Sequence, residues 1–159
     1  MSAHPDTISA LEATGGDFEV MPCDPELADT AEFCEAYGVP LEESANTILV
    51  ASRRPEGHMA ACIALAATRL DVNGLVRRRL GVRKVSFASA DLTKSVTGME
   101  IGGVTPFGLP DGLPVWIDQA VMDAESVVLG AGTRSAKIRC SPRLMLSLPD
   151  TEVVPGLAG

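Results

Sequence analysis

The chain has 159 residues, of which 46% are hydrophobic, and a net charge of −8 at pH 7. This length fits a single domain that buries about two-thirds of its unfolded surface, so neither a disulfide nor a metal is needed for stability. The acidic balance excludes broad, unspecific binding to a polyphosphate backbone, but it permits a site that grips only the end of a nucleic acid. The longest apolar run, residues 59–67, is too short to span a bilayer, and residues 1–17 lack the features of a signal peptide. We therefore expect a cytoplasmic protein with no membrane partner.

The cysteines and histidines predict no metal site. They are Cys23, Cys34, Cys62, Cys140, His4 and His58. No two cysteines form a CxxC pair and no histidine lies near one of them, so zinc is not expected. Neither a cofactor nor a catalytic Cys–His pair is indicated. Buried free thiols are the simplest interpretation of Cys34 and Cys62.

The first half of the chain predicts two helices and a hairpin. Residues 1–17 form an N-terminal extension with a short helix at 7–13, and residues 18–159 form the domain itself. The further elements expected are a strand at 17–22, a helix at 25–37 ended by Gly38, and strands at 46–52 and 59–66 joined by a turn containing Pro55 and Gly57. The two apolar strands would form a hairpin at the centre of a sheet.

The second half mixes strands with short helices. The expected order is a helix at 72–80 capped by Asp71, a strand at 83–88, a helix within 88–98 capped by Ser89, a strand at 113–118, an antiparallel pair at 125–132 and 135–140, a helix at 142–148 and a last edge strand at 151–154. No regular βαβ alternation is present. The pattern favours an α+β fold, with a mixed, mostly antiparallel sheet and flanking helices, over a doubly wound fold.

The segment "MEIGGVTPFGLP", residues 99–110, holds three glycines and two prolines. Glycines let backbone N–H groups approach a ligand, and prolines stiffen the loop that carries them. Such N–H groups suit a carbonyl oxygen, a developing oxyanion or a phosphate. The alternative is a plain tight loop packed by Phe107.

Five segments in this order resemble the YbaK family, whose domain is also associated with prolyl-tRNA synthetase. They are "ANTILVAS", "RLDVNGLVRRRLGVRKVSFAS", "TGMEIGGVTPFGLP", "LPVWID" and "VVLGAGTRSAKI". The resemblance covers about residues 18–154, and its most specific pieces are the TG-x₃-GG-x-x-P-x-G loop and the G-x-G-x-R turn. It implies a mixed, mostly antiparallel sheet curled into a partial barrel with helices around it. It also implies hydrolysis of aminoacyl-tRNAs that carry the wrong amino acid.

The resemblance further implies a set of site residues. The backbone N–H of Gly102 would bind the carbonyl of the ester between amino acid and tRNA, and Arg134 would contact the terminal adenosine. Other substrate contacts would come from Thr47, Gly103, Thr105, Pro106, Gly130, Gly132 and Lys137. A cluster of cations, which could equally be a solvated helix face, would contact acceptor-stem phosphates: Arg77, Arg78, Arg79, Arg83 and Lys84.

The sequence departs from the family pattern at two positions. Asn46 stands where the family carries a lysine, and Met21 aligns with a frequent pocket aromatic. A neutral amide makes hydrogen bonds about half as strong as charge-assisted ones, so catalysis should weaken. Lys137 is either a relocated charge or a solvent-facing side chain on an edge strand. No general base is evident, so the substrate itself or a bound water would fill that role.

Three functions remain open at this point. The first is trans-acting deacylation of a mischarged small amino acid, such as alanine or cysteine on proline tRNA, with Gly102 and Asn46 as catalytic residues. The second is a non-catalytic module that binds aminoacyl-tRNA or a related small ligand. The third takes "GAGTRS" as a nucleotide-phosphate loop, but that segment lacks a third glycine and runs into a strand. The partner expected is the acceptor end of an aminoacyl-tRNA, and association with an aminoacyl-tRNA synthetase is compatible with it.

Overall fold

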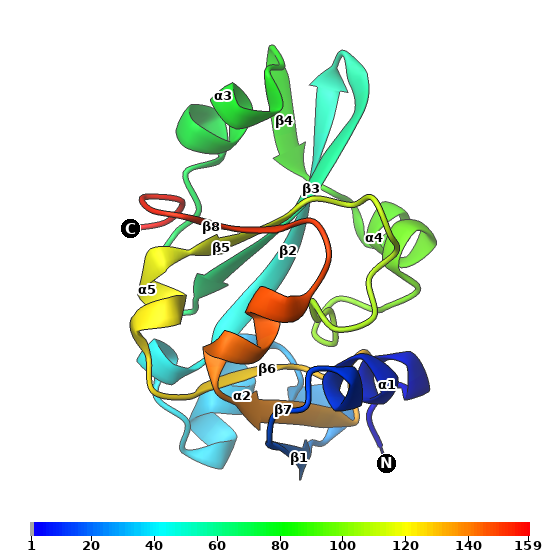
Figure 1. Cartoon of the computed structure of the whole chain (residues 1–159), viewed down its shortest axis with the longest axis vertical. Helices are drawn as coiled ribbons and strands as arrows, with labels where there is room; N and C mark the ends of the chain where they lie inside the picture. Colours follow the sequence, from blue (N-terminus) through cyan, green and yellow to red (C-terminus); the bar gives the residue numbers. More distant parts are fainter. Residues whose placement is uncertain (1) are drawn as a thin grey trace.

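The strands of the computed structural model, which describes residues 2–159, form two sheets (Figure 1). The larger sheet has the order β4-β2-β3-β5-β8, with strands Lys84–Phe87, Ala45–Arg54, Glu56–Leu65, Val115–Asp118 and Thr151–Val154. The smaller has the order β1-β7-β6, with strands Phe18–Pro22, Ala136–Cys140 and Val127–Gly130. Four strand pairs are antiparallel, and β5 runs parallel to both β3 and β8. The α+β class with mixed pairing is confirmed.

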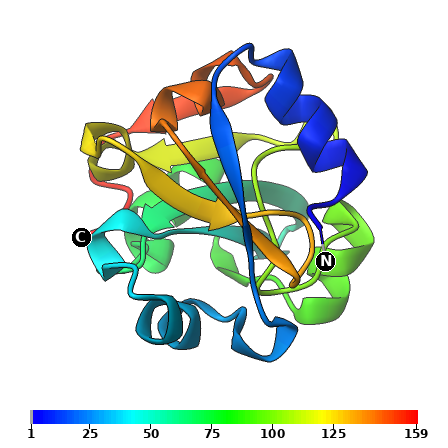
Figure 2. The ribbon, with the colours of Figure 1, turned by 90° about the horizontal axis from the view of Figure 1, so that it is seen from below.

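The expected partial barrel is wrong. The two sheets stay separate, and a single bridge, between Ser44 and Val128, joins the β2 region to β6. Beyond this bridge the facing edges of β2 and β6 do not pair, because a cavity and the loop after α4 lie between them. Figure 2 shows the smaller sheet in front of the larger one, with α1 and α2 on opposite sides of it.

The helices are short, and several of them begin or end at recognisable capping residues. They are α1 (Pro5–Ala13), η1 (Pro25–Leu27), α2 (Thr30–Tyr37), η2 (Leu41–Glu43), η3 (Val72–Val76), α3 (Arg77–Leu80), α4 (Ala90–Thr97), α5 (Gln119–Asp123) and η4 (Pro142–Ser147). Asp71 and Ser89 accept backbone N–H groups as predicted, and Gly38 ends α2 in the left-handed conformation. None of the helices within residues 2–159 is long and apolar enough to cross a membrane.

Two helical predictions need correction. Helix α5 was not expected, since its five residues carry no apolar period of their own. The helix predicted over 25–37 is split into η1 and α2, with Asp29 in extended conformation between them. The split has a physical cause: side chains from β7 and its preceding turn take the carbonyls of Pro25 and Ala28, which a continuous helix would have used itself.

Helix α1 packs into the main core. Leu11 is fully buried in the cluster formed by both sheets, and the Thr7 hydroxyl donates to the Phe107 carbonyl at 3.0 Å. All four cysteines are buried free thiols, as expected for Cys34 and Cys62. Burial raises the pKa of the Cys62 and Cys140 thiols to about 12.

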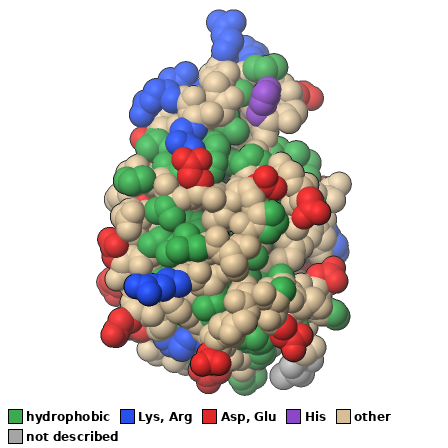
Figure 3. All heavy atoms as spheres, in the orientation of Figure 1, with side chains coloured by type: hydrophobic (Ala, Val, Ile, Leu, Met, Phe, Trp, Pro, Cys, Tyr) green, Lys and Arg blue, Asp and Glu red, His purple; other side chains and the backbone are tan. Residues whose placement is uncertain are grey.

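Charge is distributed unevenly along the long axis of the molecule. Eight of the thirteen Lys and Arg residues lie between positions 53 and 84, beside only two carboxylates. In Figure 3 the blue side chains gather at the upper end, where Figure 1 places the β2–β3 hairpin, β4 and α3. Carboxylates predominate over the lower part of this face. One end of the molecule is therefore basic although the net charge of the chain is negative.

Candidate functional site

A cavity of about 330 Å³ lies where the two sheets face each other. Its walls come from the β2 edge, β6 and β7, the start of α2, and the loop after α4. Its volume is in the range of small-ligand sites. The predicted site residues that line it are Asn46, Thr47, Gly102, Gly130 and Lys137.

The β2 edge is open along this cavity. Strand β4 pairs with β2 only from Val50 onward. One position before Val50, the outward carbonyl of Leu49 accepts the Ala88 N–H at 2.8 Å. The Ser44 carbonyl accepts the Ala66 N–H, so this carbonyl points toward β3. Along an antiparallel strand this direction alternates from one residue to the next, and the N–H and C=O of Thr47 therefore point the other way, to the open edge. Thr47 therefore presents two backbone groups to the cavity.

Thr47 also carries an unsatisfied hydroxyl. Its Oγ1 is the one buried side-chain nitrogen or oxygen in residues 2–159 that has no hydrogen-bond partner. Leaving such a group buried and unbonded costs about 1–3 kcal/mol. An unsatisfied polar atom on a cavity wall indicates a position that a ligand atom completes.

Asn46 is anchored from α2. The Thr30 hydroxyl donates to Asn46 Oδ1, which leaves the two hydrogens of the amide nitrogen available as donors. Asn46 is half-buried and lines the cavity, so the residue at the family's lysine position does reach this site.

Lys137 lies on the middle strand of its sheet, which excludes the edge-strand alternative. Its side chain is buried, and Nζ donates to the carbonyls of Ala28 at 2.6 Å and Gly102 at 2.8 Å. Burial lowers the pKa of the ammonium and the nearby Arg134 lowers it further, while Cys23, Asp29 and Cys34 raise it. Lys137 is the one Lys or Arg that lines the cavity.

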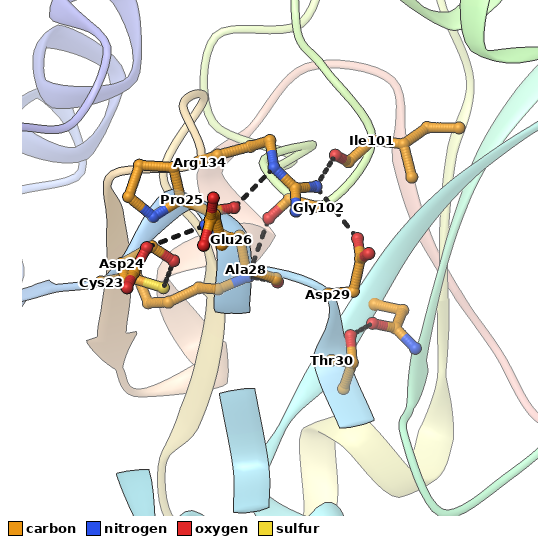
Figure 4. Close-up of polar contacts among 12 residues, drawn as sticks. Cys23, Asp24, Pro25, Glu26, Ala28, Asp29, Thr30, Ile101, Gly102 and Arg134 are labelled. Atoms are coloured by element: carbon orange, nitrogen blue, oxygen red, sulfur yellow. Dashed lines mark hydrogen bonds and ion pairs between the residues drawn. The ribbon is translucent and has the colours of Figure 1, made fainter. Parts of the chain in front are cut away.

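Arg134 fixes the glycine loop from behind. Its Nε donates to the Pro25 carbonyl at 2.9 Å, and its Nη1 donates to the Ile101 carbonyl at 2.6 Å and to Asp29 Oδ1 at 3.0 Å (Figure 4). Lys137 on β7 and Arg134 in the turn before it thus hold the η1 segment against residues 101–102. Because Arg134 makes these internal bonds, the structure gives it a bracing position.

The peptide between Ile101 and Gly102 has a defined direction. It is trans, so its N–H points opposite to the carbonyl that Arg134 binds. Within residues 2–159 the Gly102 N–H donates to no protein group. Gly102 has a φ of 92°, and a Cβ there would overlap Arg134 Nη1, so a side chain at this position is strained and displaces the guanidinium. Gly102 therefore offers a free backbone donor at the wall of the cavity.

Several residues predicted to touch substrate lie outside the cavity lining. Gly103 passes close to the Thr133 backbone, and Gly132 passes close to α1. The Thr105 hydroxyl is buried and accepts the Phe107 N–H. Two others, Pro106 and Arg134, are absent from the lining as well. These residues build the loop and its support. Met21, placed in the pocket by the sequence, packs instead against the cluster that contains Phe33.

The predicted basic cluster divides into engaged and free side chains. Arg79 pairs with Glu152 at 2.7 Å and lies over the Trp116 ring, and Arg77 Nε donates to the Asn73 carbonyl in the preceding helix η3. The others, Arg78, Arg83 and Lys84, are exposed and form no ion pair with another residue of the range 2–159.

Sequence reasoning missed residues that the fold brings to the site. Asp29 and Thr30 line the cavity, and the split of the predicted helix could not be seen in the apolar pattern. Arg53 and Arg54 join Lys84 at the basic end, and a charge count over residues 53–84 would have found them. Phe87 lines the mouth of the cavity and is 58% exposed.

The family follows from the sequence comparison. The sequence model described as "Aminoacyl-tRNA editing domain" matches residues 24–148. The chain belongs to this family. The protein YwhH of Bacillus subtilis (strain 168), described as uncharacterized, is 30% identical over 116 residues, which cover 73% of this chain and 71% of that protein.

Two solved structures share the fold of this editing domain over almost its full length. The hypothetical protein APE2540 superposes with a TM-score of 0.84 at 23% identity, covering 97% of this chain and 99% of that one. A protein described as a candidate trans-editing enzyme for prolyl tRNA synthetase superposes with a TM-score of 0.78 at 24% identity, covering 97% and 98%. The family resemblance inferred from the loop and the turn is thereby confirmed.

Proposed function

We propose that this editing domain acts in trans as an aminoacyl-tRNA deacylase that hydrolyses the ester of a small mischarged amino acid. Alanine or cysteine on proline tRNA is the first substrate to test, as the similarity to a candidate trans-editing enzyme for prolyl tRNA synthetase suggests. The observation that carries the proposal is the free Gly102 N–H, whose direction is fixed because Arg134 holds the other side of the same peptide.

The loop would bind the scissile ester carbonyl. A fixed backbone donor does not reorganise when the carbonyl oxygen gains negative charge, and one such donor is worth about 10²–10³ in rate. Thr47 lines the same cavity, and its N–H and hydroxyl are available to the amino acid or the terminal ribose. Small side chains would fit the limited volume of this cavity.

Lys137 would supply the positive charge that Asn46 lacks. Its ammonium binds the Gly102 carbonyl directly, so it both orders the loop and places a positive field beside the developing oxyanion. Asn46, held by Thr30, would orient a ribose hydroxyl or the attacking water through its amide hydrogens. In this arrangement the positive charge of the site is carried by β7, whereas the family's lysine position lies on β2.

The reaction needs positioning more than a strong base. Water forms a bond to the carbonyl carbon, the bond from that carbon to the ribose oxygen breaks, and the ribose oxygen takes up a proton. An aminoacyl ester is already activated, so orientation and oxyanion stabilisation supply most of the acceleration required. The products are the free amino acid and the uncharged tRNA.

One observation favours a second function, a binding module without catalysis. Lys137 already gives two of its three hydrogens to the carbonyls of Ala28 and Gly102, and Asn46 is neutral. A site of this kind could bind the aminoacyl ester and protect it from hydrolysis.

The test measures ester loss from alanyl-, cysteinyl- and prolyl-tRNA carrying the proline anticodon. We expect hydrolysis of the first two only, and at least a tenfold loss of rate in Lys137→Gln. Arg143→Gln is the control, since Arg143 is exposed and lies outside the cavity lining. In the double variant Asn46→Lys/Lys137→Gln the returned charge should restore activity. An inert native protein that protects the ester, with activity only in Asn46→Lys, would establish the binding module instead.

A further inference from the structure

Phe87 marks the place where the cavity opens toward the basic end. It is the last residue of β4, and its side chain is the most exposed of the large hydrophobic side chains in residues 2–159, at 58%. Phe87 lines the cavity, a second hollow of about 700 Å³ and a third of about 690 Å³. An aromatic side chain this exposed, at a residue where three hollows meet, is not explained by packing of the core.

The second hollow continues the cavity along β4 and the β2–β3 hairpin. Phe87 and Ala88 line both, and the far end of the second hollow holds Arg53, Arg54 and Lys84. Across the strand pair, Arg54 lies opposite Lys84, while Val50 lies opposite Phe87. Along β4 the backbone positions of Phe87 and Lys84 are thus three residues apart, or about 10 Å.

The charges at the far end are free to bind a ligand. Arg53, Arg54 and Lys84 are exposed, and in the described part of the chain none of them forms an ion pair. Glu56 is the one carboxylate that lines this hollow. Since the rest of the chain is acidic, a polyanion would be steered to this end and repelled elsewhere.

We infer that this groove, defined by Phe87, Arg53, Arg54 and Lys84, is a track for single-stranded RNA, in which a base stacks on Phe87 and the preceding phosphates bind the three cations. An aromatic platform beside a positive groove is the arrangement that binds unpaired nucleotides without reading their sequence. The inference rests on the proposed function for its direction: the 3′ end passes Phe87 and enters the cavity. It extends that function, because it assigns the unpaired 3′ strand to β4 and the hairpin, not to the α3 arginines.

The test measures binding and needs no hydrolysis. The probe is a fluorescein-labelled single-stranded RNA of eight nucleotides ending in CCA, without an amino acid, and the readout is fluorescence anisotropy at several salt concentrations. We expect about a tenfold weaker Kd in Phe87→Ala and near-native binding in Phe87→Trp, because a stacked base accounts for about 1–3 kcal/mol, which is roughly 5–150-fold. Phe87→Leu keeps the apolar surface and loses the stacking, and it replaces the alanine variant if that one unfolds.

The salt dependence separates phosphate contacts from stacking. Arg53→Gln and Arg54→Gln should each reduce the slope of log K against log salt by about 0.7, the value for one phosphate of a single strand, whereas Phe87→Leu should leave the slope unchanged. Arg143→Gln, an exposed residue outside this groove, is the matched control and should change neither quantity.

The outcomes distinguish this inference from the proposed function. Equal binding by native protein, Phe87→Leu and Arg54→Gln would overturn the track, even if the native protein deacylates its substrate. Equal binding of a blunt-ended RNA hairpin, with the same losses in the variants, would also overturn it, since the groove would then be reading a stem. The expected losses in a protein that fails to deacylate would support the track and reject the deacylase.

Discussion

The substitution Gly102→Ala tests the geometry on which the proposed site depends. Residue 102 has a φ of 92°, which costs an L-residue about 1–2 kcal/mol. The new Cβ would also overlap Arg134 Nη1. The guanidinium must move, and its bonds to the Ile101 carbonyl and to Asp29 are lost or weakened.

The magnitude follows from those bonds. A hydrogen bond to a charged group contributes about 1.5–3 kcal/mol, but the Asp29 side chain is 57% exposed and its share is largely screened. We therefore count one such bond, that to Ile101, and expect a total loss of about 3–4 kcal/mol. Most domains with 5–15 kcal/mol of stability remain folded after such a loss.

Gly112→Ala is a close control. Gly112 has a φ of 86°, and a Cβ there meets nothing within 4 Å, so the substitution adds backbone strain without a clash. Urea unfolding should show Gly102→Ala to be about 2 kcal/mol less stable than Gly112→Ala. The corresponding difference in Tm is about 4–8 °C. Deacylation should fall in Gly102→Ala only.

Two results would refute this reasoning. If both glycine variants lose the same stability, Arg134 does not occupy the space beside Gly102. If Gly102→Ala and Arg134→Ala are fully additive in the double variant, the two residues do not interact, since removing the guanidinium should relieve the clash and give a coupling of about 1 kcal/mol or more.

Two further predictions concern buried polar atoms. Thr47→Val replaces the unsatisfied Oγ1 by a methyl group of similar shape, so we expect the free protein to gain about 1 kcal/mol in urea unfolding while the KM for aminoacyl-tRNA rises; a loss of stability would mean that the hydroxyl has a partner. The Cys140 thiol has a pKa of about 12 in the fold and 9.0 when unfolded. The contribution of this buried thiol to the free energy of unfolding is therefore complete below pH 9 and is lost as the pH rises toward 12. Between about pH 9.5 and 10.5 the unfolding free energy of the native protein should therefore fall more steeply than that of Cys140→Ala, by about 1.4 kcal/mol per pH unit, and parallel curves would contradict the burial of this thiol.

Local features of the sequence predicted most elements of the fold. The apolar runs on either side of Pro55 form the β2–β3 hairpin, Asp71 and Ser89 cap the helices that follow them, and Gly38 ends α2. These features succeed because capping, turn geometry and strand periodicity depend on residues a few positions apart. The loop at 99–110 is predictable for the same reason, since its three glycines and two prolines lie within twelve residues.

The site depended on contacts between residues far apart in the chain. Lys137 and Ala28 are separated by 109 positions, as are Arg134 and Pro25, and these contacts split a helix that the apolar pattern predicts as continuous. The pattern cannot show this, because the energy of binding a carbonyl to a distant buried cation is absent from the local sequence. The separation of the two sheets is likewise decided by the unpaired β2 and β6 edges.

The sequence by itself determined the family, the mixed α+β class and the existence of a rigid glycine loop. Only the tertiary structure decided that Lys137 lies in the same cavity as Asn46, and that Arg134 braces the loop from outside the cavity lining. The physical reason is that a residue's type is fixed by the chain, whereas the direction in which it offers a charge or an N–H is fixed by the partners that packing brings to it.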